Sequence, residues 1–113
     1  MASDLIDKIR KARLSKVSVD GHEYTISRPT EADVIVRMAD ANDLEFVRRF
    51  VVGWDHSALS LGIPGGTEDP MPFDAGLWSD WLDDHSAVWE PLASAILNAY
   101  TSHKRAKEDA TKN

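Results

Sequence analysis

Strict alternation of apolar and polar residues marks one segment near the N-terminus as a β-hairpin. Four apolar residues alternate with polar ones around Asp20-Gly21, and they are Val17, Val19, Tyr24 and Ile26. Asp-Gly is a strong two-residue turn signal, because both residues tolerate the positive φ angles of a type I′ turn. The pattern therefore predicts a hairpin over residues 16–27.

Apolar residues at helical spacing predict helices for most of the remaining chain. The clearest run is NDLEFVRRFVVGW, where one helical face carries Leu44, Val47, Val51 and Trp54. Such runs predict a short amphipathic helix at the N-terminus and helices over residues 30–39, 42–54, 74–84 and 87–107. Thr30 with Asp33 is a variant of the capping box. The polar residues 104–113 are expected to be disordered, since they carry too few apolar side chains to pack.

Length and composition limit the fold to one domain. The chain has 113 residues and no cysteine, which excludes disulfides and thiolate metal sites. We expect a mainly α fold with a small N-terminal β-hairpin, in the α+β class, with about four to five short helices packed as one compact domain over residues 1–103. The N-terminus carries charges where a signal peptide needs apolar residues, and no apolar run reaches membrane-spanning length. A soluble, cytoplasmic protein is expected.

A long loop containing Gly and Pro separates two of the predicted helices. At roughly 18 residues it exceeds the usual connection of about 4 to 6, which indicates a functional or family-specific feature. Gly53 is expected to end the preceding helix and to direct Trp54 into the core. Asp55 is expected to bond free backbone donors or a side chain in the loop. Phe73 is expected to staple the far end of the loop ahead of a helix cap at Asp74.

Charge is distributed unevenly along the chain, whose net charge is −6. Between Phe50 and His103 there is no Lys or Arg, and this half carries all four tryptophans. Its acidic residues are Asp55, Glu68, Asp69, Asp74, Asp80, Asp83, Asp84 and Glu90. This half is either a solvated acidic surface over an aromatic core or a docking face for a basic, apolar helix. A nucleic-acid partner is disfavoured, because phosphates require a basic patch that only the two ends of the chain could supply.

The docking interpretation assigns a partner-binding surface to the last two predicted helices. Trp78 and Trp81 are about 300° apart in helical phase, so we expect some aromatic surface to stay accessible. The predicted surface consists of Trp78, Asp80, Trp81, Asp83, Asp84, Trp89 and Tyr100. An acidic and aromatic patch of this kind suits an amphipathic helix, and its binding should weaken with salt.

Catalytic and cofactor-binding motifs are weak in this sequence. The tripeptide Asp-His-Ser occurs twice, at residues 55–57 and 84–86, but consecutive residues rarely adopt the geometry of a catalytic triad. No metal-ligand spacing links the histidines, which are expected to be ordinary surface or boundary residues: His22, His56, His85 and His103. The segment GIPGGT lacks the lysine and the preceding strand of a phosphate-binding loop. We therefore expect no catalytic activity, no cofactor and no metal.

The order and spacing of several short motifs resemble the tail assembly chaperones of long-tailed bacteriophages. The chain has a helix-like run that ends in VVGWD, then a loop, then PMPFD leading into the next helix. Upstream lies the hairpin segment VSVDGHEYTISRPTEAD, and the last helix includes Tyr100. Members of that family have a Val-Gly-Trp-Asp-like helix end, a loop of variable length, and a Pro-Phe-Ser or Pro-Phe-Asp cap. The resemblance covers nearly the whole chain, although Gly65-Gly66 lengthens the loop.

This resemblance implies a non-catalytic role in building the phage tail, in the cytoplasm of the infected bacterial host. Such chaperones coat the long, helical tape measure protein, keep it soluble, help to bring tail tube protein to it, and are absent from the mature virion. Self-association is expected when no client is bound, and neither nucleic acid nor membrane is an expected partner. Two other interpretations remain open. One is a structural or head-to-tail joining protein, which would persist in virions, and the other is a small hydrolase with His56 or His85 beside a serine in a pocket.

The resemblance also predicts a property of the gene. Tail assembly chaperones are often made in a second, longer form by a programmed ribosomal frameshift near the end of the short reading frame, and this form would serve the tail tube protein. We expect Thr111-Lys112-Asn113 to be encoded as ACA AAA AAC, which contains the slippery heptamer A AAA AAC. Sequencing the gene tests this, and codons that break the heptamer, with no other slippery site nearby, contradict it.

Overall fold

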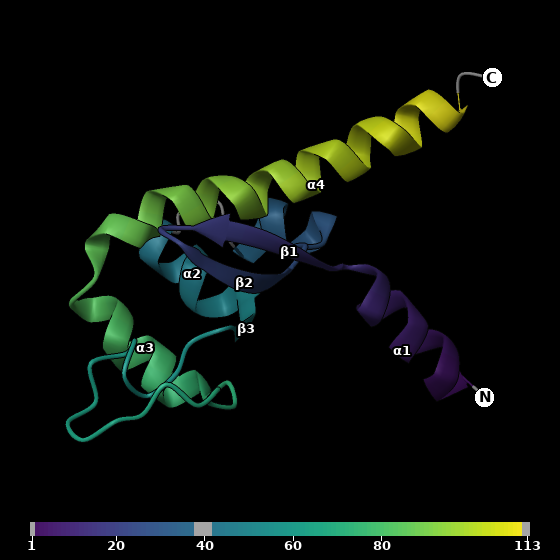
Figure 1. Ribbon diagram of the computed structural model, residues 1–113. Helices are drawn as coiled ribbons and strands as arrows, with labels where there is room; N and C mark the ends of the chain where they lie inside the picture. The colour runs from purple at the N-terminus through teal and green to yellow at the C-terminus, as the bar shows by residue number, and fades with distance from the viewer. Residues whose placement is uncertain (1, 38–41, 112–113) are drawn as a thin grey trace.

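The computed structural model describes residues 2–37 and 42–111, and it combines helices with one small antiparallel sheet (Figure 1). The helical elements are α1 (Ala2–Ala12), the π-helix η1 (Asp33–Arg37), α2 (Asp43–Phe50), α3 (Ala75–Asp83), the 3-10 turn η2 (Ser86–Val88) and α4 (Trp89–Thr111). The strands are β1 (Leu14–Val19), β2 (His22–Ser27) and β3 (Val51–Trp54), in the sheet order β1-β2-β3. The α+β class expected from the sequence is confirmed.

The hairpin forms where the alternation predicts it. β1 and β2 pair antiparallel, with Val17 opposite Tyr24. Asp20 and Gly21 make the turn with φ angles of 52° and 80°, the signs that a type I′ turn requires. Because side chains alternate between the two faces of a strand, Tyr24 and Ile26 both point into the core and are fully buried.

The prediction of a helix through residue 54 is wrong. α2 ends at Phe50, and the chain continues as β3, which pairs antiparallel with the free edge of β2. Apolar spacing alone does not distinguish a helix from a buried strand over so short a run. Val51 and Val52 are β-branched and favour a strand, and the edge of β2 supplies backbone partners. Trp54 therefore reaches the core from the sheet, instead of from the end of a helix.

Gly53 serves this sheet and is not a helix stop. It lies opposite Thr25 of β2, and a Cβ atom at Gly53 would lie 3.0 Å from both the Cβ and the Oγ1 of Thr25. A side chain at this position would push the two strands apart. The absence of a side chain lets β3 approach β2, so that Trp54 stands opposite Tyr24.

The predicted cap at Thr30 and Asp33 is confirmed, although the helix that follows it differs from the prediction. The Thr30 N–H donates to Asp33 Oδ2 (3.0 Å), and the Asp33 N–H donates to Thr30 Oγ1 (3.1 Å). This reciprocal pair satisfies two backbone donors that a helix start would leave unpaired. It precedes the short π-helix η1 instead of an α-helix over residues 30–39. Residues 38–39 of that prediction lie outside the described residues.

Side chains also cap α2 and α3. Asp74 accepts a hydrogen bond from the Leu77 N–H (2.8 Å), as predicted, and starts α3. Asn42 accepts one from the Glu45 N–H (3.0 Å) and starts α2, a cap that was not predicted. Each cap satisfies a backbone donor that the first helical turn leaves unpaired.

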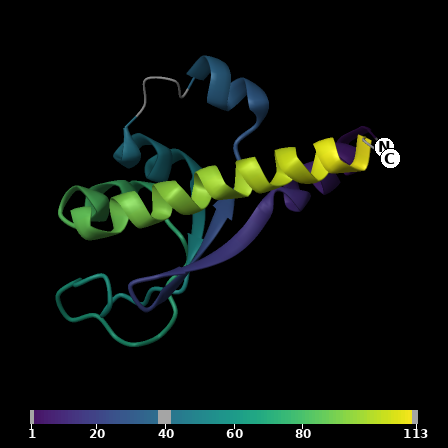
Figure 2. The same cartoon turned by 90° about the horizontal axis from the view of Figure 1, so that it is seen from above.

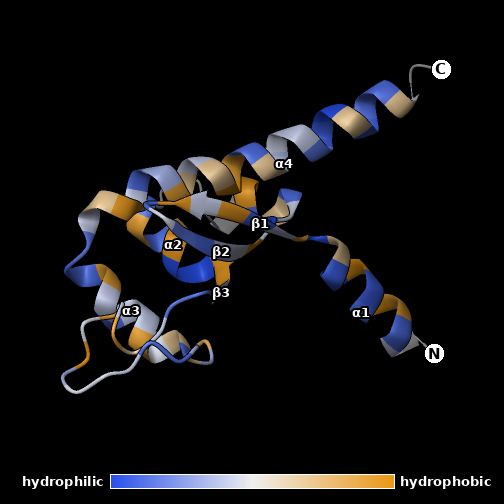
Figure 3. Cartoon of the chain, viewed as in Figure 1, coloured by the Kyte–Doolittle hydropathy of each residue, from blue (hydrophilic) through white to orange (hydrophobic). Residues whose placement is uncertain are grey.

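Both ends of the chain are helical and project from the body on the same side (Figures 1 and 2). α4 runs to Thr111, so the predicted disorder is wrong for residues 104–111, while residues 112–113 lie outside the described part. Lys, Arg, Ala and Glu dominate these turns, and they extend an existing helix at little cost. In α1 the apolar residues Leu5, Ile6 and Ile9 are exposed, and Figure 3 shows that hydrophobic and hydrophilic positions alternate along this projecting helix.

The buried core is shared by the sheet, α2, α3 and α4. It consists of Tyr24, Ile26, Phe46, Val47, Phe50, Val51, Trp78, Leu82, Val88, Leu92, Ala93 and Ile96. α4 packs along α2, and both flank the same apolar cluster. Arg48 on the outer side of α2 pairs with Asp83 of α3, which ties these two helices together at the surface.

Hydrogen bonds within the loop over residues 55–73 hold it in a defined shape. The Met71 N–H donates to the His56 carbonyl (3.0 Å), and the Leu59 N–H donates to the Thr67 carbonyl (3.0 Å). Leu61 is buried beneath these turns. At Gly66 a Cβ atom would lie 2.7 Å from the backbone of Ala58, so the two-glycine extension allows a close approach inside the loop.

The two ends of this loop meet at Trp54 and Phe73. Their ring centroids are 4.8 Å apart, and the Trp54 Nε1–H donates to the Met71 carbonyl (2.8 Å). Both side chains are half-buried and pack against the core cluster. The predicted staple at Phe73 is therefore present, and Trp54 is less deeply buried than the sequence suggested.

Substitutions at Trp54 should separate ring packing from hydrogen bonding. Trp54→Ala removes both and should lower the free energy of unfolding by roughly 3 kcal/mol, at the low end for an aromatic side chain because Trp54 is half-buried. Trp54→Phe keeps most of the packing and should cost about 1 kcal/mol, the usual value of a single hydrogen bond. Denaturant unfolding measures both values. Equal costs for the two variants would contradict the assigned role of the ring.

Candidate partner-binding site

The hairpin turn, the start of the long loop and the end of α3 enclose a cavity of about 380 Å³. The hairpin contributes Asp20, His22 and Tyr24; the loop contributes His56 and Ser60; the α3 end and η2 contribute Trp81, Asp84, His85, Ser86, Ala87 and Val88. Rings therefore form much of the wall, and two carboxylates belong to the lining. The cavity brings together residues that are far apart in the sequence.

Asp55 fixes the loop to the hairpin. Its two carboxylate oxygens accept hydrogen bonds from the His22 ring (3.0 Å) and from the Glu23 N–H (3.0 Å). Partial burial raises the pKa of Asp55, but these two hydrogen bonds outweigh that effect and hold the pKa below its usual value. Asp55 was expected to bond free backbone donors or a side chain in the loop; it does accept a backbone N–H, but both of its partners lie in β2.

His56 lies at the bottom of the cavity and is fully buried. Its Nε2 is 2.7 Å from the Tyr24 hydroxyl, and its Nδ1 is 2.9 Å from Ser60 Oγ. Ser60 Oγ donates to the Ser57 carbonyl (3.0 Å) and accepts the Ser57 N–H (2.9 Å). One proton assignment uses every contact: Tyr24 donates to Nε2, and Nδ1–H donates to Ser60.

The burial of this pair also sets its protonation. Burial and the nearby His22 and His85 lower the pKa of His56 to about 4, although Asp55 opposes the shift. Burial, together with the charges of Asp55 and Asp20, raises the pKa of the Tyr24 hydroxyl well above its usual value. Both groups are therefore neutral near pH 7, as the hydrogen-bond assignment requires.

The hydrolase interpretation required a histidine beside a serine in a pocket, and His56 with Ser60 meets that geometric condition. The hydrogen-bond assignment given above does not meet the chemical condition for a hydrolase, however. The Ser60 hydroxyl proton points to the Ser57 carbonyl, and the His56 lone pair accepts from Tyr24. A general base must instead accept the proton of the nucleophile. With the protons assigned in this way, His56 does not accept the proton of Ser60, and it connects the loop to Tyr24 of the hairpin.

Three aromatic rings stack in succession between the core and the surface. Trp78 and Trp81 stack with centroids 5.5 Å apart and an interplanar angle of 15°. His85 stacks on Trp81 at 3.8 Å and 6°, and its Nδ1–H donates to the Trp81 carbonyl (2.7 Å). Trp78 and Trp81 lie on neighbouring parts of the helix surface, because a phase difference of about 300° in one direction equals about 60° in the other. This stacking fixes the position of the Trp81 indole, which lines the cavity.

The predicted partner-binding residues are not one continuous patch. Trp78 is buried, with 1% of its surface exposed, so the prediction that it binds a partner is wrong. Trp89 is half-buried and its Nε1–H donates to the Leu82 carbonyl (2.8 Å), which places it in the joint between α3 and α4. Tyr100 lies in a different groove, among basic residues. These aromatic residues were assigned to the surface from their helical phase, and phase alone does not show which side of a helix other elements cover.

The acidic part of the prediction fits better. Asp80 of α3 and Asp84, the residue that follows the helix, are both exposed, and Asp84 lines the cavity together with Trp81. Asp83 is exposed too, but it pairs with Arg48 and is therefore partly neutralised. Asp20 of the hairpin turn adds a further carboxylate to the same cavity. The site that the structure supports thus consists of Trp81, Asp84 and Asp20 over a floor of Tyr24 and His56.

The sequence interpretation missed the histidines and the tyrosine of this cavity. His56 was expected to be an ordinary surface or boundary residue, and it is instead a buried hydrogen-bonded core residue. The two Asp-His-Ser copies were the available signal, because their histidines both line the cavity. Across residues 2–37 and 42–111, no group of three or more His, Cys, Asp or Glu side chains is arranged to hold a metal ion.

Comparisons of this chain with protein-family models, curated proteins and solved structures gave no match. In the described part of the chain, no helix is both long and apolar enough to cross a lipid bilayer.

The buried neutral His56 should make stability depend on pH. Its pKa is about 4 in the folded protein and near 6.5 in the unfolded chain, so the unfolded chain binds more protons between these values. The free energy of unfolding should therefore fall as pH drops from about 6.5 to 4, by roughly 2 to 3 kcal/mol. Asp55, with a lowered pKa, contributes a loss only at lower pH.

Denaturant unfolding across this pH range measures the effect. His56→Gln keeps a polar side chain but does not titrate, so the slope between about pH 6.5 and 4 should be smaller in this variant. Equal slopes in the two proteins would contradict the assignment of a neutral, buried imidazole.

Proposed function

We propose that this chain is a non-catalytic chaperone that holds a basic, amphipathic helix of a larger protein. The phage tail assembly chaperones that its sequence resembles hold the tape measure protein, and we propose the same client here, in the cytoplasm of the infected host. The observation that carries this proposal is the cavity lined by Trp81, Asp84 and Asp20. Tail tube protein, recruited through a longer form, is a further proposed partner.

The chemistry of the cavity supports a cationic guest. The carboxylates of Asp84 and Asp20 attract a Lys or Arg side chain directly, and the rings in the lining offer apolar contact for its methylene groups. The acid-rich half of the chain carries no Lys or Arg that would neutralise these carboxylates from within.

The motifs behind the resemblance have structural roles that support the same proposal. Trp54 and Phe73 close the ends of the loop, and Asp55 ties it to the hairpin. Asp74 begins the helix that carries Trp81. These residues build the frame of the cavity and do not line it, which suits a family whose motifs are structural and whose client contacts vary.

The placement of the acids supports transient binding. Exposed carboxylates contribute little each and are screened by salt over about 8 to 10 Å. A single copy would therefore hold its client weakly and could leave a finished particle. Many copies along one long helical client would still keep it soluble, because avidity supplies the strength that one contact lacks.

Charge reversal at the cavity should abolish client protection. We expect co-expression with wild-type protein to keep the tape measure protein soluble. The pair Asp20→Lys and Asp84→Lys, which reverses the two carboxylates of the lining, should return most of it to the insoluble fraction, and Trp81→Ala should do so in part. Soluble and insoluble fractions are compared after lysis, and a pull-down at two salt concentrations measures the electrostatic share.

A matched control variant makes the same change in charge outside the cavity. Glu68→Lys with Asp69→Lys reverses two exposed acids of the loop and should leave client solubility unchanged. Circular dichroism establishes that each variant is folded. If the folded cavity variants protect the tape measure protein as well as wild type, the cavity is not the client site.

A further inference from the structure

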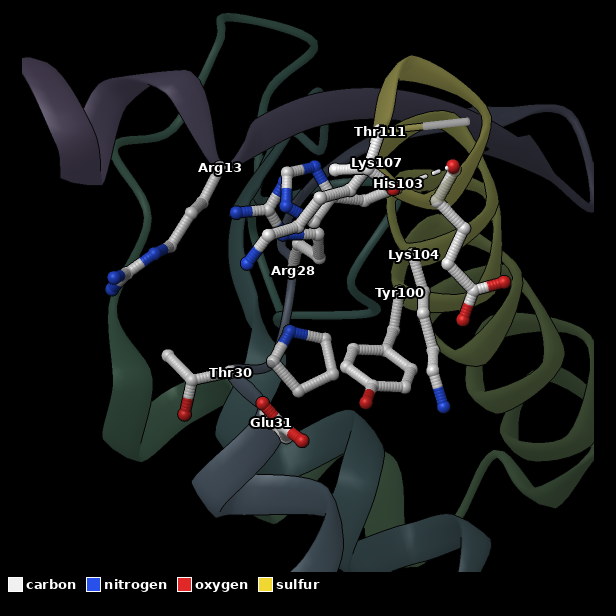
Figure 4. A pocket seen from close by; sticks show the side chains of 11 residues that line it. Arg13, Arg28, Thr30, Glu31, Tyr100, His103, Lys104, Lys107 and Thr111 are labelled. Carbon is white, nitrogen blue, oxygen red and sulfur yellow. Dashed lines mark hydrogen bonds between the residues drawn. The ribbon is translucent and has the colours of Figure 1, made fainter. Parts of the chain in front are cut away.

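A basic groove lies where the residue before β1 and the residues after β2 meet α4. Its volume is about 390 Å³, and its basic lining residues are Arg13, Arg28, His103, Lys104 and Lys107. Figure 4 shows Arg13 on one side of the groove and the α4 side chains on the other, with Arg28 between them. Three separate segments therefore bring basic side chains to one place, in a chain with a net charge of −6.

The cations of the groove have no partners within the described part of the chain. Across residues 2–37 and 42–111, no ion pair and no side-chain hydrogen bond involves any of these four: Arg13, Arg28, Lys104 and Lys107. Partial burial and the charge of Arg13 lower the pKa of Arg28, so the two guanidinium groups repel each other. Like charges held together without partners are unfavourable for folding, and such departures are typical of binding sites.

The lining residues of α4 form one stripe, because they recur three or four residues apart along the helix. In chain order they are Tyr100, His103, Lys104, Lys107, Glu108 and Thr111. The two lysines therefore lie between Tyr100 and Glu108. A second carboxylate, that of Glu31, lines the end of the groove where Tyr100 lies (Figure 4). A carboxylate at each end confines the positive charge to the middle of the groove.

This arrangement favours a compact dianion. The pKa of His103 is lowered by desolvation and by the charges of Arg28 and Lys107, so its ring is neutral near pH 7 and adds no charge. The remaining four cations exceed the two carboxylates of the lining by two charges, which a dianion would balance. A nucleic-acid backbone continues beyond the middle of the groove, and the carboxylates at the ends would repel it.

A phosphate monoester matches these requirements. It carries about two negative charges near pH 7, and its three terminal oxygens are strong hydrogen-bond acceptors. Guanidinium groups bind phosphate through two parallel hydrogen bonds, and two such groups belong to this lining, on Arg13 and Arg28. A bound phosphate would also relieve the repulsion between these two side chains.

The groove has room for more than a phosphate group. Its volume lies within the range of about 300 to 1,000 Å³ that is usual for small-molecule sites. Besides Glu31, the end away from Glu108 is lined by the ring of Tyr100 and by Pro29, which offer apolar contact. An organic group attached to the phosphate would lie against them, because the cations hold the phosphate at the middle of the groove.

We propose that the basic groove binds a small organic phosphate, with its phosphate among Arg13, Arg28 and Lys107 and its organic part against Tyr100. The inference is independent of the proposed client site, because no described residue lines both the groove and the acidic cavity. Such a ligand would join α4 to the segments before β1 and after β2, and it would stabilise the folded chain by binding to it.

Histidine ring signals in heteronuclear NMR spectra report which site takes the ligand. His103 lines the groove, whereas the other three histidines line the acidic cavity: His22, His56 and His85. Titration with AMP should shift the signals of His103 to saturation and leave the other three unchanged, since the carboxylates of the cavity repel phosphate. Sodium chloride at equal ionic strength is the control. Equal shifts of all four histidines, or shifts that the salt reproduces, overturn the proposal.

Matched substitutions test the cations of the groove. Arg28→Gln with Lys107→Gln should weaken AMP binding at least about tenfold, because hydrogen bonds to a charged group are lost. Lys8→Gln with Arg105→Gln removes the same two charges from exposed positions outside the groove and should leave the affinity unchanged.

Circular dichroism shows whether both variants are folded. Lys104→Gln with Lys107→Gln changes two exposed residues of α4 and repeats the test without altering the half-buried Arg28. Equal affinities of the folded groove variants and the control variant overturn the proposal.

Isothermal titration calorimetry with inorganic phosphate, ribose phosphate and AMP tests the organic part of the ligand. Both esters should bind more tightly than inorganic phosphate, and AMP by about two- to tenfold, since its base can contact the Tyr100 ring. Tyr100→Ala should remove this advantage of AMP and leave the affinity for inorganic phosphate unchanged. Equal affinities of wild type for all three ligands overturn the proposal. So does a groove that binds a glutamate-rich peptide but neither ester, because it would then be a protein-docking surface.

Discussion

The pairing of β3 with the free edge of β2 is the constraint on which the rest of the structure depends. It is favoured by Gly53, because a Cβ atom at this position would lie 3.0 Å from the Thr25 side chain, which would have to shift. It also fixes where the chain goes next. Asp55 emerges over the hairpin and bonds to it, and His56 follows into the space beside Tyr24. A helix continuing to residue 54 would have carried these side chains away from the hairpin, and the cavity would not exist.

The character of the cavity follows from that placement. His56 is surrounded by rings of Tyr24, Trp54 and Trp81, and its two nitrogens are both used in hydrogen bonds. A charged imidazole is unfavourable in such a setting, so the floor is neutral and rigid. The charge of the site comes instead from carboxylates in its lining. A neutral aromatic interior with an acidic rim favours a cationic side chain, and it requires no conformational change to do so.

Charge is separated across the molecule by the fold as well as by the sequence. α3 lies at one end of the molecule and the projecting half of α4, which carries cations of the groove, lies at the other, so these two charged groups do not pair with each other, although Asp83 of α3 pairs with Arg48. A protein built in this way has a directional electrostatic field that orients whatever approaches it. Binding of a charged partner at either end should therefore weaken as the salt concentration rises.

The sequence by itself determined the features that depend on neighbouring residues. Alternation with Asp20-Gly21 specified the hairpin, and the caps at Thr30 and Asp74 were readable because a cap and its backbone donor are about three residues apart. The tertiary structure decided what depends on distant partners. Val51–Trp54 is a strand because the edge of β2 is open to it, and Trp78 is buried while Trp81 lines a cavity because other elements cover only one of them. The groove joins Arg13 and Arg28 to α4, and no local pattern encodes a contact between segments so far apart in the chain.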